Sequence, residues 1–138
     1  PAAVEAKLLI EGDTDRAMEA ESVLDAASLV GLQREVARIT LDPALATYLQ
    51  AVLNASRTCS ALSLGASTRA GISLARAARA RALLRGRDYC IADDVHELAV
   101  NVLSHRVRLA AHAEGYVPSR EEAENAVRDV VARVPVPL

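Results

Sequence analysis

The chain has 138 residues, a formal net charge of −2 and 25% charged residues of both signs. This balance argues against a dedicated DNA-binding protein, whose charge would be strongly positive, and no apolar run is long enough to cross a bilayer. Hydrophobic residues make up 51% of the chain, yet it has three tyrosines and no phenylalanine or tryptophan, so alanine, leucine and valine must fill the core. We therefore expect closely packed helices rather than a sheet.

The first forty residues predict a helix tail, a turn and one clear helix. Residues 4–10 have the pattern of a helix end, 12–15 are turn formers, and the mostly polar stretch 16–24 fits either a loop or a short helix. A helix over 28–39 is predicted from apolar residues at helical spacing, namely Leu29, Leu32, Val36 and Ile39. The dipeptide Thr40-Leu41 is then expected to be briefly extended.

A strong helix start follows at Asp42-Pro43, since aspartate is a preferred N-cap and proline is favoured at the first helical position. The apolar residues of this helix are Leu45, Leu49, Val52 and Leu53. The helix is expected to fade over 54–57, and 58–65 is predicted to be a linker.

The stretch 64–88, LGASTRAGISLARAARARALLRGRD, is the most informative part of the sequence. It predicts a helix with Ser67 as N-cap and Arg85-Gly86 at its end, where arginine and glycine are both favoured. Arg69 stands in the first turn, where the helix already presents partial positive charge, so a cation there is misplaced by about 0.3–1 kcal/mol. A bound anion would reverse that sign. The sequence therefore suggests that a negatively charged ligand binds beside Arg69.

The next segments predict a short extended piece and another helix. Residues 87–91 are expected to be extended, and a helix begins near Ala92 with Asp93 and Asp94 in its first turn, where acidic residues are favoured. Residues 107–113 fit either a strand or a loop.

The end of the chain predicts one more helix. Residues 115–118 are a break, and Ser119, with Glu122 three residues later, fits a capping box that opens a helix over 120–133. The total is about five helices, which predicts an all-α fold, a small helical bundle with short extended segments at most.

Several short strings, in this order, resemble the C-terminal part of MoxR-type AAA+ ATPases. They are Gly65-Ala66-Ser67-Thr68-Arg69-Ala70, Ala77-Ala78-Arg79-Ala80, Gly86-Arg87-Asp88-Tyr89, Asp94-Val95 and Val102-Leu103-Ser104-His105-Arg106. The likeness covers about 4–137 and is densest over 64–106. Each string alone is weak, and their order and spacing make the resemblance specific.

The resemblance implies a helical lid that follows a nucleotide-binding α/β core. The family's Gly-Ala-Ser-Pro-Arg-Ala motif carries the sensor-2 arginine, which reaches the terminal phosphates of ATP. By position this residue is Arg69, and Ser67 is the second nucleotide-binding residue implied. ATP and Mg²⁺ would bind to the full-length protein and not to this piece alone. On this interpretation 1–138 is a single lid domain, in which 1–27 links to the missing core and 28–138 forms the bundle.

The same resemblance implies a cytoplasmic protein with a role in chaperone-like maturation of protein complexes. Its implied partners are its own AAA+ core, neighbouring subunits of a hexameric ring and a von Willebrand factor A-domain protein, with no membrane and no nucleic acid. The chain starts PAAVEAKLL, without an initiator methionine and as if in mid-helix, so we expect it to be a piece of a longer protein.

The sequence departs from the family pattern in three respects. Thr68 replaces the usual proline, and Ile91-Ala92 stands where the family has Thr-Pro, so the helix after it lacks a good cap. The sequence contains no Gly-x-x-x-x-Gly-Lys-Ser/Thr loop and no acidic magnesium-binding strand. The piece alone is therefore not expected to hydrolyse ATP, whereas its full-length parent is predicted to be an ATPase.

The remaining arginines, and the acidic pair Asp93-Asp94, have simpler interpretations than a site. Arg76 lies on nearly the same face as Arg69. Four more arginines follow it: Arg79, Arg81, Arg85 and Arg87. All five are interpreted as solvated positions whose stems cover an alanine-rich helix, or else as a subunit contact. A favourable helix start explains Asp93-Asp94 without a metal.

No metal or redox site is predicted from the cysteines and histidines. Cys59 and Cys90 have no ligand spacing and are expected to be free buried thiols in a reducing compartment. The three histidines lack the i, i+4 pair of a helical zinc site: His96, His105 and His112.

Two other functions stay open from the sequence alone. A freestanding helical interaction or DNA-binding module could place the basic helix after Ser67 in a groove or against a partner, and a start codon directly before Pro1 would favour it. A lid from a neighbouring branch, such as the magnesium chelatase-type subunits, would keep the fold and the role of Arg69 but change the client and pathway.

Overall fold

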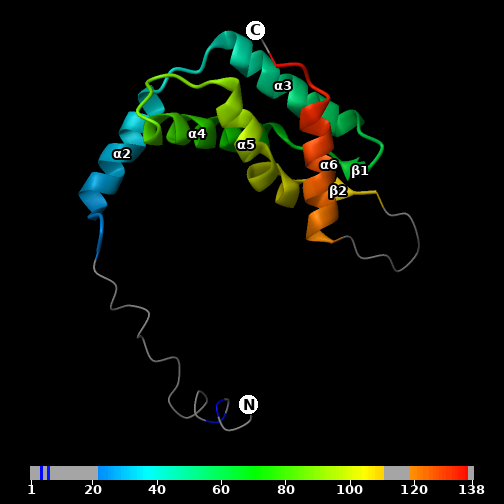
Figure 1. Cartoon of the computed structure of the whole chain (residues 1–138), viewed down its shortest axis with the longest axis horizontal. Helices are drawn as coiled ribbons and strands as arrows, with labels where there is room; N and C mark the ends of the chain where they lie inside the picture. Colours follow the sequence, from blue (N-terminus) through cyan, green and yellow to red (C-terminus); the bar gives the residue numbers. More distant parts are fainter. Residues whose placement is uncertain (1–3, 5, 7–21, 111–118, 137–138) are drawn as a thin grey trace. The chain divides into compact units, whose positions relative to one another are not determined.

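The computed structural model describes residues 4, 6, 22–110 and 119–136, and the chain divides into two compact units, 1–31 and 32–138. The described elements are α2 Ala26–Arg38, α3 Pro43–Thr58, β1 Leu62–Leu64, α4 Thr68–Leu84, α5 Ala92–Leu103, the 3₁₀ turn η2 Ser104–Arg106, β2 Arg108–Leu109 and α6 Arg120–Ala132 (Figure 1). The predicted all-α class is confirmed, with a single two-stranded sheet beside five α-helices in the described residues.

Some predictions fall outside this described part. Of the expected helix tail, only Val4 and Ala6 are described, and both are helical. The turn at 12–15, most of 16–24 and the break at 115–118 lie among residues that the structure does not describe. The division into a linking segment 1–27 and a bundle 28–138 stays a prediction.

Helix starts and ends follow the capping residues that the sequence predicted. The Asp42 carboxylate accepts the backbone N–H of Ala44 at 2.7 Å, and Pro43 is the first residue of α3. At the other end of α4, Gly86 adopts a left-handed φ of 71°, which glycine tolerates without a Cβ penalty. The N–H of Arg87 then reaches the carbonyl of Ala82 at 2.9 Å, which closes the helix end.

Small side chains form the core between α3, α4 and α5, as the composition predicted. The buried residues of α4 are Ala70, Gly71, Leu74, Ala78 and Ala82, which recur at helical spacing and are joined in the core by Val52, Val95, Ala99 and Leu103. Helix α4 packs against α3 and α5, and α6 packs against the same two helices (Figure 1). Short side chains on the buried face of a helix allow its neighbours to approach closely.

The expected linker at 58–65 is not entirely a linker, because it contains strand β1. This strand pairs antiparallel with β2. Of the segment 107–113, for which strand and loop were both open, Arg108 and Leu109 are therefore strand. The Ser63 hydroxyl adds a bond to the carbonyl of Leu109 at 2.9 Å. Strands of two and three residues are too short to show alternation in a sequence, which is why the pattern did not reveal β1.

A pair of extended backbone contacts joins the segments before α3 and α5. The N–H of Thr40 donates to the carbonyl of Asp88 at 2.8 Å, and the N–H of Cys90 donates to the carbonyl of Thr40 at 2.9 Å. Thr40 and Tyr89 thereby form an isolated parallel bridge. Both short extended segments predicted from the sequence are confirmed at these residues.

Replacing Ser119 by alanine is expected to lower the free energy of unfolding by about 1 kcal/mol, because α6 loses its N-cap. The Ser119 hydroxyl accepts the N–H of Glu122 at 3.2 Å, and the Glu122 carboxylate accepts the N–H of Ser119 at 2.8 Å. Chemical denaturation of the chain measures the loss. Ser119→Asp keeps an acceptor and should unfold like the wild type, and an equal loss in both variants would contradict the capping role.

Candidate functional site

The predicted site lies at the start of α4. Ser67 is the N-cap, and its hydroxyl oxygen accepts the N–H of Ala70 at 3.2 Å. Thr68 is the first helical residue, and the first turn holds no acidic residue. A helix start with free N–H groups and no carboxylate of its own has a positive potential.

Arg69 adds a full positive charge to this helix start. Its side chain is exposed, and its guanidinium makes no hydrogen bond or ion pair with any residue that the structure describes. No carboxylate in the described part of the chain forms an ion pair with Arg69. The arrangement leaves a charged, planar donor group available to an anion.

Two consecutive residues at the end of α3 hold the segment that precedes α4. The Ser56 hydroxyl accepts the N–H of Ala66 at 2.9 Å, and the Arg57 Nε donates to the carbonyl of Ala66 at 3.0 Å. Gly65 lies so close to α3 that an added Cβ would stand 2.6 Å from the Arg57 Cα. We call these four residues the α3–α4 clamp: Ser56, Arg57, Gly65 and Ala66.

A third arginine, Arg106 of η2, reaches α4 at Ser73, one turn beyond Arg69. The Arg106 Nη1 donates to the Ser73 hydroxyl at 2.9 Å, and that hydroxyl donates to the carbonyl of Arg69 at 3.1 Å. Within the described residues no carboxylate forms an ion pair with Arg57, Arg69 or Arg106. Positive charge thus collects at the end of α4 where the sequence predicted an anion.

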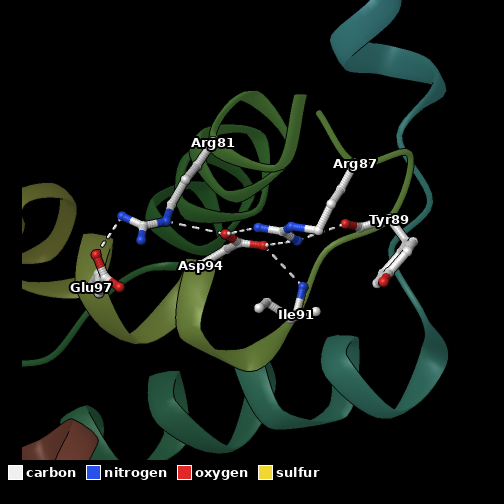
Figure 2. Close-up of polar contacts among 6 residues, drawn as sticks. All are labelled: Arg81, Arg87, Tyr89, Ile91, Asp94 and Glu97. Carbon is white, nitrogen blue, oxygen red and sulfur yellow. Dashed lines mark hydrogen bonds and ion pairs between the residues drawn. The ribbon is translucent and has the colours of Figure 1, made fainter. Parts of the chain in front are cut away.

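The other end of α4 carries a buried ion-pair cluster that the sequence did not predict (Figure 2). Asp94 is 1% exposed, and one of its oxygens lies 3.1 Å from the Arg81 Nε and 2.7 Å from the Arg87 Nη2. Its second oxygen accepts the Arg87 Nη1 at 2.8 Å and the N–H of Ile91 at 2.9 Å. We call these residues, together with Glu97, which pairs with Arg81, the Asp94 cluster.

The charges in this cluster shift the protonation of its members. Burial alone would raise the pKa of the Asp94 carboxyl, but hydrogen bonds from Arg87, from the Ile91 backbone and from Arg81 outweigh it, so that the pKa lies below its ordinary value. The hydrogen bond to Asp94 raises the pKa of Arg87 in turn. Asp94 is therefore a charged structural anchor and not a proton donor near neutral pH.

The interpretation as solvated positions is wrong for Arg79, Arg81 and Arg87, whereas Arg76 and Arg85 are exposed as expected. Arg81 and Arg87 are engaged by Asp94, and the Arg79 Nε donates to the carbonyl of Ile39 at 3.1 Å. The favourable helix start explains only part of the role of Asp94, which also replaces the cap that Ile91 cannot provide. An acid at the third helical position after an apolar N-cap was the available signal for this role.

The cysteines and histidines build no site in the described part of the chain. Cys90 is buried, Cys59 is half-buried, and both are free. Burial, together with the charge of Asp94, raises the pKa of the Cys90 thiol, which keeps it protonated and unreactive. His96 and His105 are exposed, His112 lies outside the described residues, and no metal-binding group of His, Cys, Asp or Glu occurs among the residues described.

No helix in the described residues is long and apolar enough to cross a membrane.

Comparison with known sequences relates the chain to ATPase lids. Residues 54–130, more than half of the chain, match the family model of the AAA lid domain. The chain is 37% identical over 120 residues to the uncharacterized protein YeaC of Bacillus subtilis, covering 86% of this chain and 36% of that protein. It is 36% identical over 123 residues to chaperone MoxR1 of Mycobacterium tuberculosis, covering 83% of this chain and 33% of that protein. The chain thus spans about a third of the length of these relatives.

Structural comparison supports the same fold. A crystal structure of a "putative ATPase" from Cytophaga hutchinsonii superimposes with a TM-score of 0.75 and 23% sequence identity, covering 99% of this chain and 43% of that one. The matched segment 54–130 contains α4 and its start, the end of α3 and all of α5. The chain therefore belongs to the AAA lid domain family and is the C-terminal lid of a MoxR-like AAA+ ATPase.

Proposed function

We propose that this lid closes over ATP bound to a separate nucleotide-binding core and brings Arg69 to the terminal phosphates, as a sensor-2 arginine. The observation that carries the proposal is the exposed guanidinium of Arg69, which has no partner in the described residues and stands at a helix start without a carboxylate. Its planar fork can donate to two phosphate oxygens at once. The partial positive charge of the α4 start repels Arg69, and bound phosphates would attract both of them.

The described residues fit part of the nucleotide and not its metal. Arg69 offers donors to phosphate oxygens, and the Ser67 hydroxyl, which accepts from Ala70, keeps its own proton for a further oxygen. No group of His, Cys, Asp or Glu that could hold a metal occurs among the described residues, and we propose that the metal and the remaining phosphate contacts belong to the core. ATP supplies the bond that is hydrolysed, and this chain supplies positive charge that stabilises the phosphate oxygens.

The wider setting follows from the family. We propose a cytoplasmic protein that works as a ring, hexameric in the simplest case, in which loss of the terminal phosphate releases Arg69 and changes the lid angle. That change would act on ring neighbours or on a client in chaperone-like maturation of protein complexes, with a von Willebrand factor A-domain protein as a candidate partner. A DNA-binding module gains no support, because Arg79, Arg81 and Arg87 bond within the protein.

Arg69→Ala in the full-length protein is expected to lower kcat for ATP hydrolysis about a hundred- to thousandfold, the range found when one preorganised donor to a transition state is removed. The lid itself should not be destabilised, because the change removes a cation from the positive end of a helix. Steady-state ATPase assays and thermal unfolding measure the two effects.

Arg85→Ala is the matched control, since Arg85 is also exposed but follows the last turn of the same helix. It should keep wild-type turnover. Unchanged turnover in Arg69→Ala, or an equal loss in both variants, would remove Arg69 from the proposed mechanism.

A further inference from the structure

We propose that Arg57 is a positioning residue for Arg69, through the α3–α4 clamp, and that it sets the rate of ATP hydrolysis without touching the nucleotide. This inference rests on the proposed function of Arg69. It concerns how the protein positions a guanidinium that makes no hydrogen bond or ion pair with the described residues.

The clamp fixes both backbone polar groups of Ala66. Its N–H is bound by the Ser56 hydroxyl at 2.9 Å, and its carbonyl by the Arg57 Nε at 3.0 Å. Ser56 is 2% exposed and also donates to the carbonyl of Leu53 at 2.6 Å, so it is itself held in place. Ala66 precedes the N-cap Ser67, and Arg69 follows two residues later. The orientation of the first turn of α4 is therefore set from α3.

Gly65 makes this connection rigid. A Cβ on Gly65 would stand 2.6 Å from Arg57 Cα, from Arg57 N and from Ser56 C. The backbones of the two segments are thus in direct contact, with no side chain between them to absorb a displacement. Movement of the end of α3 must carry the start of α4 with it.

The contacts of Arg57 indicate that it holds the start of α4 and does not bind the nucleotide. Each of its three guanidinium nitrogens donates to a neutral acceptor of the protein: the carbonyl of Ala66, Thr68 Oγ1 at 3.4 Å and Asn54 Oδ1 at 3.3 Å. Two of these acceptors flank the N-cap of α4. The bond to Thr68 exists because this chain carries a hydroxyl, and not the proline ring of the family pattern, at the first helical position.

The test is a double-mutant cycle in the full-length protein, with Arg57→Ala, Arg69→Ala and the double variant. We expect Arg57→Ala to lower kcat about ten- to hundredfold, because a misplacement of about 1 Å at a catalytic group can cost about a hundredfold. In the Arg69→Ala background the same change should cost less than about twofold, because its effect passes through Arg69. Arg57→Lys, with one donor group in place of a fork, should retain more turnover than Arg57→Ala.

The outcomes separate this inference from the proposed function. If Arg69→Ala lowers turnover but Arg57→Ala does not, the positioning role is wrong and the proposed function stands. If the losses multiply fully in the double variant, Arg57 acts independently of Arg69 and the inference is overturned. If Arg69→Ala does not change turnover, both the proposed function and the positioning role of Arg57 are wrong. Thermal unfolding of each variant shows whether a loss arises from a displaced helix start or from an unfolded lid.

Discussion

Asp94→Asn is expected to lower the free energy of unfolding of the chain by about 3–5 kcal/mol, the range found when one partner of a buried ion pair is removed. Asp94 is 1% exposed and accepts from Arg81, from Arg87 and from the N–H of Ile91. An amide keeps the shape but leaves two guanidinium groups facing a neutral residue. Urea denaturation followed by circular dichroism measures the change.

Asp93→Asn is the matched control, since Asp93 is the exposed neighbour in the same first turn of α5. It should cost no more than about 1 kcal/mol, the size of a helix-dipole interaction. Equal losses of unfolding free energy at the two positions would show that Asp94 stabilises the chain only through the helix dipole and not through its ion pairs.

The Asp94 cluster also gives stability a pH dependence. The folded protein lowers the pKa of Asp94 below the ordinary 3.8, so its stabilisation is complete above that value and is lost as the pH falls through the lower folded pKa. The difference in unfolding free energy between the wild type and Asp94→Asn should therefore be constant near neutral pH and narrow below about pH 4. A difference that grows on acidification would contradict this assignment.

Gly65→Ala is expected to cost about 3 kcal/mol of stability, because the new Cβ would meet backbone atoms of α3 and not a side chain that can rotate away. The start of α4 must shift, so the ATPase activity of the full-length protein should fall as well. Thermal unfolding and turnover are measured on the same samples.

Two other glycines provide the comparison. At Gly31 in α2 an added Cβ meets nothing within 4 Å, so alanine there should be neutral or stabilising by up to about 1 kcal/mol. At Gly71 the Cβ would meet the tip of the Leu53 side chain, which can turn, so the cost should be smaller than at Gly65. If all three alanine variants behave alike, the close approach at Gly65 does not govern the helix start.

The parts of the fold that the sequence predicted are those with a local cause. Asp42, Ser67 and Ser119 cap their own helices through residues two or three positions away, and Gly86 ends α4 through its own φ. The position of Arg69 in the first turn of α4 follows from the same rule. Such features can be derived from one segment because every partner lies within that segment.

The parts that the sequence did not predict depend on partners from other segments. The Asp94 cluster joins α4 to α5, and the clamp joins α3 to residues nine or ten positions further along the chain. Residues 54–57 were expected to fade into a linker, yet α3 continues to Thr58 because Ser56 is buried against Ala66. Tertiary contacts of this kind override local propensity and leave no periodic signal.

The alanine stripe of α4 has a mechanical consequence. Alanine has no side-chain rotamers to exchange, so the seam that Ala70, Ala78 and Ala82 form in the core cannot repack in response to a load. A helix of 17 residues spans about 25 Å, the distance over which the two charged ends of α4 are kept apart. On the proposed function, a pull on Arg69 would therefore be passed along α4 to the Asp94 cluster with little rearrangement of the alanine seam.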